Sequence, residues 1–253
     1  MRKIAALLVV TLATCVSSLQ AQSAPVRGPD GNTRTTTPGI DVLPYPNRPF
    51  SGTDTIVRTR VIEGGGTITT SLTAKVVRDS QGRLYRERHY FATADVDPQK
   101  TLYEFTVFDP ISHTRTICTL AARQCTVTNY HPQFSYRMQP TGAFDKGKRF
   151  LARENLGQQS IGGLPTTGTR EITTISPGTV GNDKEITLSR EFWYSPDLQT
   201  NLTVTRKDPS EGTVDIHLNV LSRDEPDPSV FVIPANYTVH NDELQAATAL
   251  PSN

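Results

Sequence analysis

The chain is poor in the residue types on which most catalytic and metal sites depend. It has three cysteines and five histidines among 253 residues, and the histidines form no H-E-x-x-H motif. A G-x-S-x-G motif, the nucleophile elbow of many serine hydrolases, is also missing. These absences disfavour zinc-protease and serine-hydrolase chemistry, and we predict neither a cofactor nor a metal.

An excess of charge of one sign is missing too. The formal net charge is +1, with 20% charged residues, and no polybasic segment interrupts the chain. Nucleic acids and anionic membrane surfaces attract proteins with a concentrated basic patch. We therefore predict no nucleic-acid partner.

The one long apolar run stands at the start of the chain. Arg2 and Lys3 precede an apolar stretch from Ile4 to about Leu12, and small residues lead to Ala21. This order is typical of a secretory signal peptide over residues 1–21, and the run is too short to span a bilayer. We expect an exported protein, periplasmic or extracellular, without a transmembrane span in its mature part.

Cys15 lies inside this leader, in the segment LATC, which loosely resembles a bacterial lipoprotein box. Thr14 occupies the position where that pattern has Gly, Ala or Ser. A cysteine removed with the leader is therefore favoured over a lipid anchor.

The other two cysteines, Cys118 and Cys125, lie in TRTICTLAARQCTVTNY. Export permits a disulfide, and a hairpin centred on Ala121 and Ala122 would place the two cysteines directly opposite each other. Their spacing does not match a redox or metal C-x-x-C motif. We predict a structural disulfide.

Composition divides the mature chain into three parts. Residues 22–50 are rich in Pro, Gly, Thr and Asn and show no apolar period, so we expect a flexible or extended lead-in. Residues 241–253 lack a strand pattern and are expected to form a tail. A single domain is predicted over 51–240.

Within 51–240 apolar residues alternate with polar ones. Ile216 and Leu218, for example, alternate with Asp215, His217 and Asn219, as in half-buried antiparallel strands. Turn sequences rich in Gly, Pro, Asp and Ser separate the runs, which predicts a meander of about ten strands. The strongest helix candidate is FDKGKRFLARENLG (144–157), although Gly147 interrupts it.

The segment RDEPDPSVFVIPANYTV (223–239) carries three acidic residues among prolines. Their spacing does not supply the regular oxygen ligands of a calcium loop. We interpret it as a Pro-punctuated crossing followed by an apolar edge strand or anchor at 230–233.

Several stretches together resemble a family of exported bacterial proteins of unknown function. They are VVRDSQGRLYRE, FDPISHTRT, ENLGQQSIGGLPTTGTRE, EFWYSPDLQTNLTVTRKDPSEG and RDEPDPSVFVIPANYTV, and together they extend over about 55–240. More remotely, the strand order is similar to the half-barrel of the lipoprotein-localisation factors. This resemblance implies a mainly β fold with a single large curved antiparallel sheet, half-barrel-like and with little helix. It also implies an apolar concavity, although helices that would plug it are not evident.

Two groups of side chains could face a ligand. In EFWYS, Glu191 and Trp193 project to the face opposite Phe192 and Tyr194. Asp215 and His217 share one face of another strand, but neighbours on one face are about 7 Å apart, so a solvated strand face is favoured over a metal site.

Arg86 and Arg88 in GRLYRERHYF interleave with tyrosines and could clamp an anion. Glu87 interrupts them, so cross-strand ion pairs are the favoured interpretation.

Three functions remain open at this stage. The leading one is a non-catalytic exported cell-envelope protein that binds a lipid, another hydrophobic ligand or an envelope protein on its curved sheet. The second is a hydrolase whose site is assembled from several strands, with Asp215, His217 and Glu191. The third is a structural component of the envelope.

Overall fold

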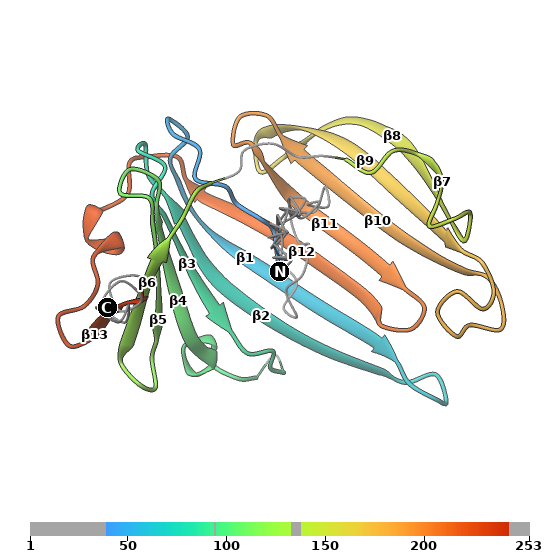
Figure 1. Ribbon diagram of the computed structural model, residues 1–253, viewed down its shortest axis with the longest axis horizontal. Coiled ribbons are helices and arrows are strands. Elements are labelled where there is room, and N and C mark those ends of the chain that lie inside the picture. The colour runs from blue at the N-terminus through green and yellow to red at the C-terminus, as the bar shows by residue number, and fades with distance from the viewer. Residues whose placement is uncertain (1–38, 94, 133–137, 243–253) are drawn as a thin grey trace, which may run out of the picture.

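The computed structural model describes residues 39–93, 95–132 and 138–242 (Figure 1). The predicted leader, Cys15, residues 22–38 and the tail from residue 243 lie outside this part of the chain. Across the described residues, no helix has the length and apolar character needed to cross a membrane.

Nearly all regular structure is strand. Two 3-10 helices accompany the strands, η1 (Pro98–Thr101) and η2 (Pro228–Phe231). The strands are β1 (Phe50–Val61), β2 (Thr67–Arg78), β3 (Leu84–His89), β4 (Leu102–Asp109), β5 (Thr114–Thr119), β6 (Gln124–Asn129), β7 (Gly142–Phe144), β8 (Arg149–Ile161), β9 (Leu164–Ile175), β10 (Ile186–Ser195), β11 (Thr200–Asp208), β12 (Gly212–Ser222) and β13 (Thr238–Asn241).

All thirteen strands belong to one sheet, in the order β13-β6-β5-β4-β3-β2-β1-β12-β11-β10-β9-β8-β7. The sheet therefore consists of two meanders, β1 to β6 and β7 to β12, joined in the middle by the antiparallel pair β1–β12. The strand β13 pairs with β6 in parallel, whereas the neighbouring pairs are antiparallel. The predicted fold class, a single large antiparallel sheet, is confirmed.

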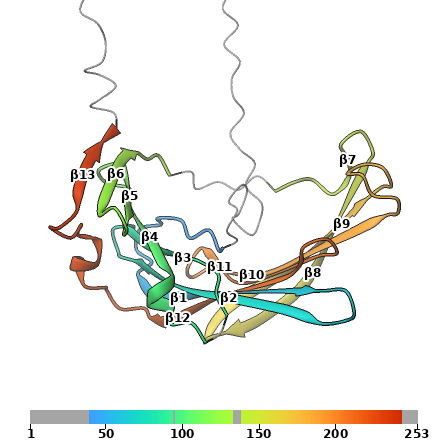
Figure 2. The ribbon, with the colours of Figure 1, turned by 90° about the horizontal axis from the view of Figure 1, so that it is seen from below.

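The sheet bends into a trough (Figure 2). We call its concave side the inner face and its convex side the outer face. Residues 39–49, the strap, lie against the inner face, whereas residues 223–237, the outer segment, run outside the end formed by β3 to β6 (Figures 1 and 2).

The inner face carries the larger apolar core. Alternation along the strands turns every second side chain inward, so that Ile216 and Leu218 are buried while His217 between them is exposed. The buried members of this cluster are Ile40, Val42, Phe50, Ile56, Leu72, Ala74, Val76, Leu84, Leu164, Phe192, Leu198, Leu202, Val204, Val214, Ile216 and Leu218.

The strap corrects one expectation from composition. Residues 22–50 were predicted to contribute little buried surface, yet Ile40, Val42 and Leu43 are 1%, 3% and 2% exposed. Prolines and polar residues prevent a strand here, but the few apolar side chains still pack onto the inner face. Residues 39–49 thus belong to the folded domain, and the boundary predicted at residue 50 comes too late for this part.

A second, smaller cluster lies on the outer face under the outer segment. Val77, Phe105 and Val107 pack there against the disulfide and against Phe231 of η2. Cys118 and Cys125 are cross-strand partners of β5 and β6 and form the predicted disulfide.

Two local predictions were wrong. Residues 144–157 form the β7–β8 hairpin instead of a helix, because Asp145, Lys146 and Gly147 adopt positive φ in the connecting turn. Residues 230–233 do not form an edge strand: Phe231 ends a 3-10 helix, and the edge strand is the more polar Thr238–Asn241.

Candidate binding site on the inner face

The strap is fixed at its C-terminal half by Arg78, the last residue of β2. The Arg78 side chain is fully buried and donates to the carbonyl oxygens of Leu43 (2.7 Å), Arg48 (2.9 Å) and Leu198 (2.7 Å). Burial lowers the pKa of the Arg78 guanidinium to about 10, so the group still carries its charge at neutral pH. One side chain thereby joins the strap, β2 and the β10–β11 turn.

The N-terminal half of the strap meets the sheet at Asp54 of β1. The Asp54 carboxylate accepts from the backbone N–H of Ile40 (3.4 Å) and from Arg86 (3.2 Å). Burial raises the pKa of Asp54 above its ordinary value and outweighs the opposite influence of Arg86. The strap thus begins with a long hydrogen bond and ends with short ones.

A row of arginines crosses the inner face beyond the strap. Register places Arg153 of β8 opposite Glu171 of β9, Glu171 opposite Arg190 of β10, and Arg190 opposite Arg206 of β11. Arg206 pairs with Val214 of β12, which in turn pairs with Arg58 of β1. We call Arg58, Arg153, Arg190 and Arg206 the basic row.

Glu171 is the carboxylate within this row, and its side chain is 1% exposed. It accepts from Arg153 Nε (2.9 Å) and from Arg190 Nη2 (2.9 Å). Arg153 also donates to the carbonyl oxygen of Gln139 (2.9 Å), and the Arg58 guanidinium lies 4.8 Å from the centre of the Phe91 ring. The row is therefore ordered by contacts at both ends.

An apolar row runs beside the basic row. It consists of Phe192, Val204, Ile216 and Ile56, which are successive cross-strand partners on β10, β11, β12 and β1. Phe192, Val204 and Ile56 each lie two residues along their strand from an arginine of the basic row, a separation of about 7 Å, whereas Ile216 lies two residues from Val214. Apolar and cationic side chains thus form two parallel bands on one concave surface.

Glu191 and Trp193, predicted as ligand-facing candidates, lie on the outer face. Trp193 donates its indole N–H to Glu191 (3.1 Å), and Arg170 bridges Glu191 and Glu154 at 3.0 Å each. The Trp193 ring also covers Gly168, where a Cβ would come within 2.6 Å of it. This aromatic side chain packs on its own sheet.

Asp215 and His217 also lie on the outer face and are not brought together with Glu191. Asp215 accepts from Thr205 Oγ1 (2.7 Å), while Thr205 stands between Asp215 and Glu191 in the strand order. Two strand spacings separate the Cα atoms of the two acids, about 10 Å. The arrangement required for the hydrolase hypothesis is not assembled.

Arg86 and Arg88 lie on β3 and form the cross-strand ion pairs that the sequence favoured. Arg86 pairs with Asp54, and Arg88 Nε is 3.3 Å from Glu104 on the neighbouring strand β4. Their partners come from either side of β3, so an anion clamp by the two arginines together is not formed.

Sequence reasoning missed the basic row because its members come from four strands far apart in the chain. A local signal was nevertheless present. Arg58 follows Ile56, Arg190 precedes Phe192, and Arg206 follows Val204, each two residues away. An arginine within the inward-facing set of an alternating strand is unusual, since charged side chains are rarely turned toward a core.

A carboxylate–imidazole–hydroxyl series was also missed. His89 Nε2 lies 3.2 Å from Glu87, and His89 Nδ1 lies 3.0 Å from Thr101 Oγ1. Although burial favours protonated Glu87, hydrogen bonds from His89, the Lys75 N–H and Tyr85 hold its pKa below the ordinary value. His89 and Thr101 are 3% and 8% exposed, so the hydroxyl is closed to a substrate and the series is a buried structural network.

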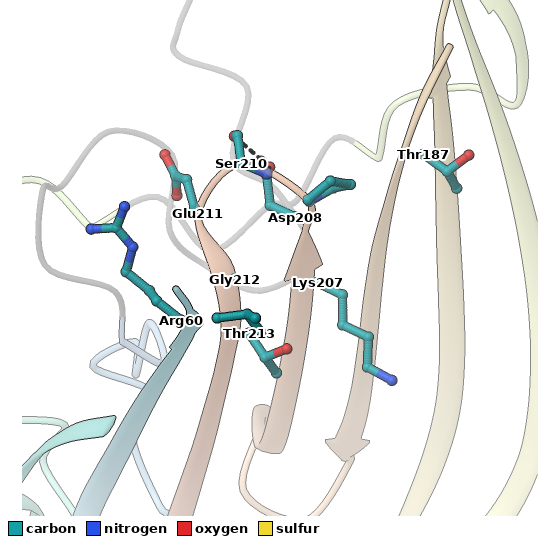
Figure 3. A pocket seen from close by; sticks show the side chains of 10 residues that line it. Arg60, Thr187, Lys207, Asp208, Ser210, Glu211, Gly212 and Thr213 are labelled. Carbon is teal, nitrogen blue, oxygen red and sulfur yellow. Dashed lines mark hydrogen bonds between the residues drawn. The ribbon is translucent and has the colours of Figure 1, made fainter. Parts of the chain in front are cut away.

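One shallow pocket of about 330 Å³ lies at the β11–β12 turn (Figure 3). Arg60, Lys207, Asp208 and Glu211 contribute to its wall, and Asp208 accepts from the N–H and hydroxyl of Ser210. The wall consists of the ends of β1, β11 and β12, the turn between β11 and β12, and Thr187 of β10. Within the described ranges, no group of three or more His, Cys, Asp or Glu side chains could hold a metal ion.

Comparisons with known proteins give no family. No family model matches the chain, and no curated protein matches it. Solved structures of similar shape include a LolA-superfamily protein from Nitrosomonas europaea, with 10% identity, 74% of this chain and 91% of that chain covered, and a TM-score of 0.29.

Two further structures are similar at the same level. They are the lipoprotein LppX from Mycobacterium tuberculosis (12% identity, 70% and 90% covered, TM-score 0.25) and a putative outer membrane lipoprotein-sorting protein domain from Vibrio parahaemolyticus (7%, 72% and 89%, 0.27). They include the superfamily whose half-barrel the sequence resembles. At these scores the likeness carries no information about what this chain binds.

Proposed function

We propose that the protein is a non-catalytic, exported binding protein whose inner face holds the apolar part of a ligand. The observation that carries this proposal is the inner apolar cluster, which is covered by a strap without regular secondary structure. A strand or helix in that place would be an integral layer of the fold. A strap can be replaced by another chain of similar thickness.

The two halves of the strap differ in how they are held. Arg78 binds the carbonyl oxygens of Leu43 and Arg48, and the Arg48 side chain in turn donates to the carbonyl oxygens of Pro196 (3.0 Å) and Asp197. Residues 39–42 instead contribute Ile40 and Val42 to the apolar cluster and a long hydrogen bond to Asp54. The N-terminal half is therefore the part that a ligand would displace.

Replacing part of the strap by a ligand costs little free energy. A hydrocarbon chain that takes the positions of Ile40 and Val42 restores the same apolar burial, at about 0.8 kcal/mol per buried CH₂. Each released backbone residue regains about 1–2 kcal/mol of conformational entropy. Displacing a few strap residues thus costs little, while the sheet beneath stays intact.

Export is supported by two features. The signal-peptide pattern of residues 1–21 predicts it, and the Cys118–Cys125 disulfide is of the kind that persists in oxidising compartments. An envelope location, periplasmic or extracellular, agrees with both.

The direct test is extraction of lipids from protein purified from its native source, followed by mass spectrometry. We expect an acyl-containing species in stoichiometric amount, and binding of a fluorescent fatty-acid probe by the delipidated protein. Ile40→Ala should bind the probe more tightly, because the strap competes less well. The matched variant Val239→Ala, at a side chain 53% exposed, should bind as the wild type. No extracted species together with no probe binding would contradict the proposal.

A further inference from the structure

Asp54 is a buried acid of the inner face whose hydrogen bonding is incomplete. Its side chain is 2% exposed, and its cross-strand partners, Ala74 on β2 and Leu218 on β12, both belong to the inner apolar cluster. Asp54 Oδ2 accepts from the Ile40 N–H and from Arg86 Nη2, whereas Oδ1 has no hydrogen-bond partner. Buried polar atoms are almost always bonded, so an oxygen left without a partner in an apolar cluster needs an explanation.

Glu171, another buried acid of this face, is bonded on both oxygens. Its side chain is 1% exposed, Oε1 accepts from Arg153 and Oε2 accepts from Arg190. Both donors come from the strands on either side of β9. Asp54 instead receives one of its two hydrogen bonds from the strap, which is the segment that the proposed function treats as replaceable.

The strap residues Gly39 and Ile40 lie directly over the pair of Asp54 and Arg86. A Cβ added at Gly39 would come within 2.5 Å of Arg86 Nη2 and 3.6 Å of Asp54 Oδ2. The Ile40 N–H is bonded to Oδ2 at 3.4 Å, which is longer than the usual range of about 2.7–3.2 Å. Displacing these two residues would uncover the ion pair and remove one donor from Asp54.

A hydrocarbon chain alone is an incomplete replacement for this part of the strap. It would restore the apolar contacts of Ile40, but Asp54 would then lack a donor at Oδ1 and would lose the strap's donor at Oδ2. A buried group that loses its partner carries the full cost of its removal from water. The ligand therefore needs a hydrogen-bond donor at the point where its hydrocarbon chain begins.

The surroundings of Asp54 restrict the kind of donor. An ammonium group would lie beside Arg86, which is itself a cation, and an ionised phosphate or carboxylate offers acceptors only. Burial raises the pKa of Asp54, and a hydroxyl suits both protonation states, because it donates to a carboxyl oxygen and can also accept from a carboxyl proton. A neutral hydroxyl meets these conditions.

Building on the proposed function, we propose that Asp54 selects a neutral lipid with a hydroxyl group, such as a long-chain alcohol or a monoacylglycerol. The hydroxyl takes the place of the Ile40 N–H on the Asp54 carboxyl, and Arg86 holds the same carboxyl from β3. The hydrocarbon chain takes the positions of Ile40 and Val42 over the apolar cluster. Asp54 is thus a residue that determines specificity within the inner-face site.

Titration calorimetry with two isomeric probes tests the inference. 1-Octanol and heptyl methyl ether have the same composition and similar length, but the alcohol donates a hydrogen bond and the ether cannot. The ether loses less hydration on entering an apolar site, so a site without a hydrogen-bond partner would not favour the alcohol. We expect the wild type to bind octanol about tenfold more tightly than the ether, the net gain of one hydrogen bond.

Asp54→Val keeps a side chain of similar size in β1 and removes both oxygens. We expect it to lose the preference for octanol and to bind the ether as the wild type does. Because it leaves Arg86 without its carboxylate, the double substitution Asp54→Val/Arg86→Met serves as a second variant that removes the whole ion pair. It should show the same loss, and urea unfolding should show that each variant is folded.

Asp215→Val is the matched control. Asp215 lies on β12, the strand that pairs with β1, but it is on the outer face, where it accepts from Thr205. The same change of side chain at this position should leave the tenfold preference for octanol intact.

The possible results separate the two proposals. Equal binding of both probes by the wild type overturns the role of Asp54 and keeps the apolar site, whereas binding of neither probe contradicts the proposed function itself. A preference for octanol that survives in both Asp54 variants would assign the hydroxyl to another group and overturn the inference. Loss of the preference in Asp215→Val would also overturn it, because the effect would then not depend on the inner face.

Discussion

Two arginine arrangements on the inner face show how the same residue type serves different ends. Arg78 is fully buried, and its guanidinium donates to three carbonyl oxygens that come from the strap and the β10–β11 turn. Arg190, by contrast, has a side chain 33% exposed and shares Glu171 with Arg153. The first arrangement is directed at backbone carbonyl oxygens, and the second at the carboxylate of a neighbouring strand.

The two arrangements contribute differently to the stability of the sheet. Hydrogen bonds to fixed carbonyl oxygens hold segments together, so losing them costs stability. An ion pair with one partly exposed partner contributes less, because water screens that partner. Substitutions on the two sides should therefore have separable effects.

Replacing Arg78 should have the largest effect on stability, because this residue joins the strap to the sheet. Arg78→Leu removes donors from three carbonyl oxygens, of which those of Leu43 and Leu198 are bonded in buried positions, and should lower the free energy of unfolding by about 3–5 kcal/mol. Urea unfolding followed by circular dichroism measures this. Arg190→Gln in the same assay should cost less than Arg78→Leu, because Arg153 still donates to Glu171. Equal losses would erase the distinction between the two arrangements.

Removing the disulfide extends the comparison to the outer face. The Cys118→Ala/Cys125→Ala variant should lose about 2.5 kcal/mol, because the covalent link closes a short loop in the unfolded chain. The same unfolding assay on the wild type with and without reductant should give a matching difference. Acyl-probe binding should be unaffected by the double substitution, since the bond lies in the cluster on the outer face. A loss of binding would show that the two faces are coupled.

The outer face of the sheet has its own tight contact, at Gly168. A Cβ added there would lie 2.6 Å from the Trp193 ring, so Gly168→Ala should cost about 1–3 kcal/mol through overpacking. Because Trp193 is the single tryptophan, its fluorescence should shift as the ring moves and loses its bond to Glu191. An unchanged emission spectrum would mean that the ring does not rest on this backbone.

The smallest effect is a pH dependence at Glu87. Its folded-state pKa is lowered, so the stabilisation is present above the ordinary value of 4.5 and is lost as pH falls through the folded pKa. Glu87→Gln should therefore cost about 1 kcal/mol near neutral pH, where it weakens hydrogen bonds to a charged acceptor. Unfolding curves of the two proteins should converge in acid. A difference that persists in acid would assign the effect to packing instead.

Local patterns were enough to predict much of the fold. Alternation predicted the strands around Ile216 and Leu218, and turn residues predicted the hairpins that flank Trp193. The spacing of Cys118 and Cys125 predicted their pairing, because a hairpin is a short-range structure whose register is set by its own turn.

What the sequence did not predict depends on contacts between distant segments. The basic row appears when the register of six strands is known, and Glu171 meets Arg190 across a connection of ten residues. The strap was missed for a related reason: composition averages over residues 22–50, whereas burial is decided by Ile40, Val42 and Leu43 individually. The predicted ligand-facing candidates Glu191, Trp193, Asp215 and His217 were chosen from local sequence alone. The sheet places all four on its outer face, with Glu191 and Asp215 on different strands.

The pairing of β1 with β12 affects how the chain folds. Its register, from Ser51 opposite Ser222 to Thr59 opposite Thr213, joins segments that are almost the whole domain apart in sequence, and such contacts form slowly. Each meander can assemble from neighbouring hairpins before β1 pairs with β12. Until β12 arrives, β1 and β11 each present a long unpaired edge that can pair with another molecule. The folding chain is thus most prone to aggregation before β12 joins the sheet, and a chaperone would be needed most at that moment.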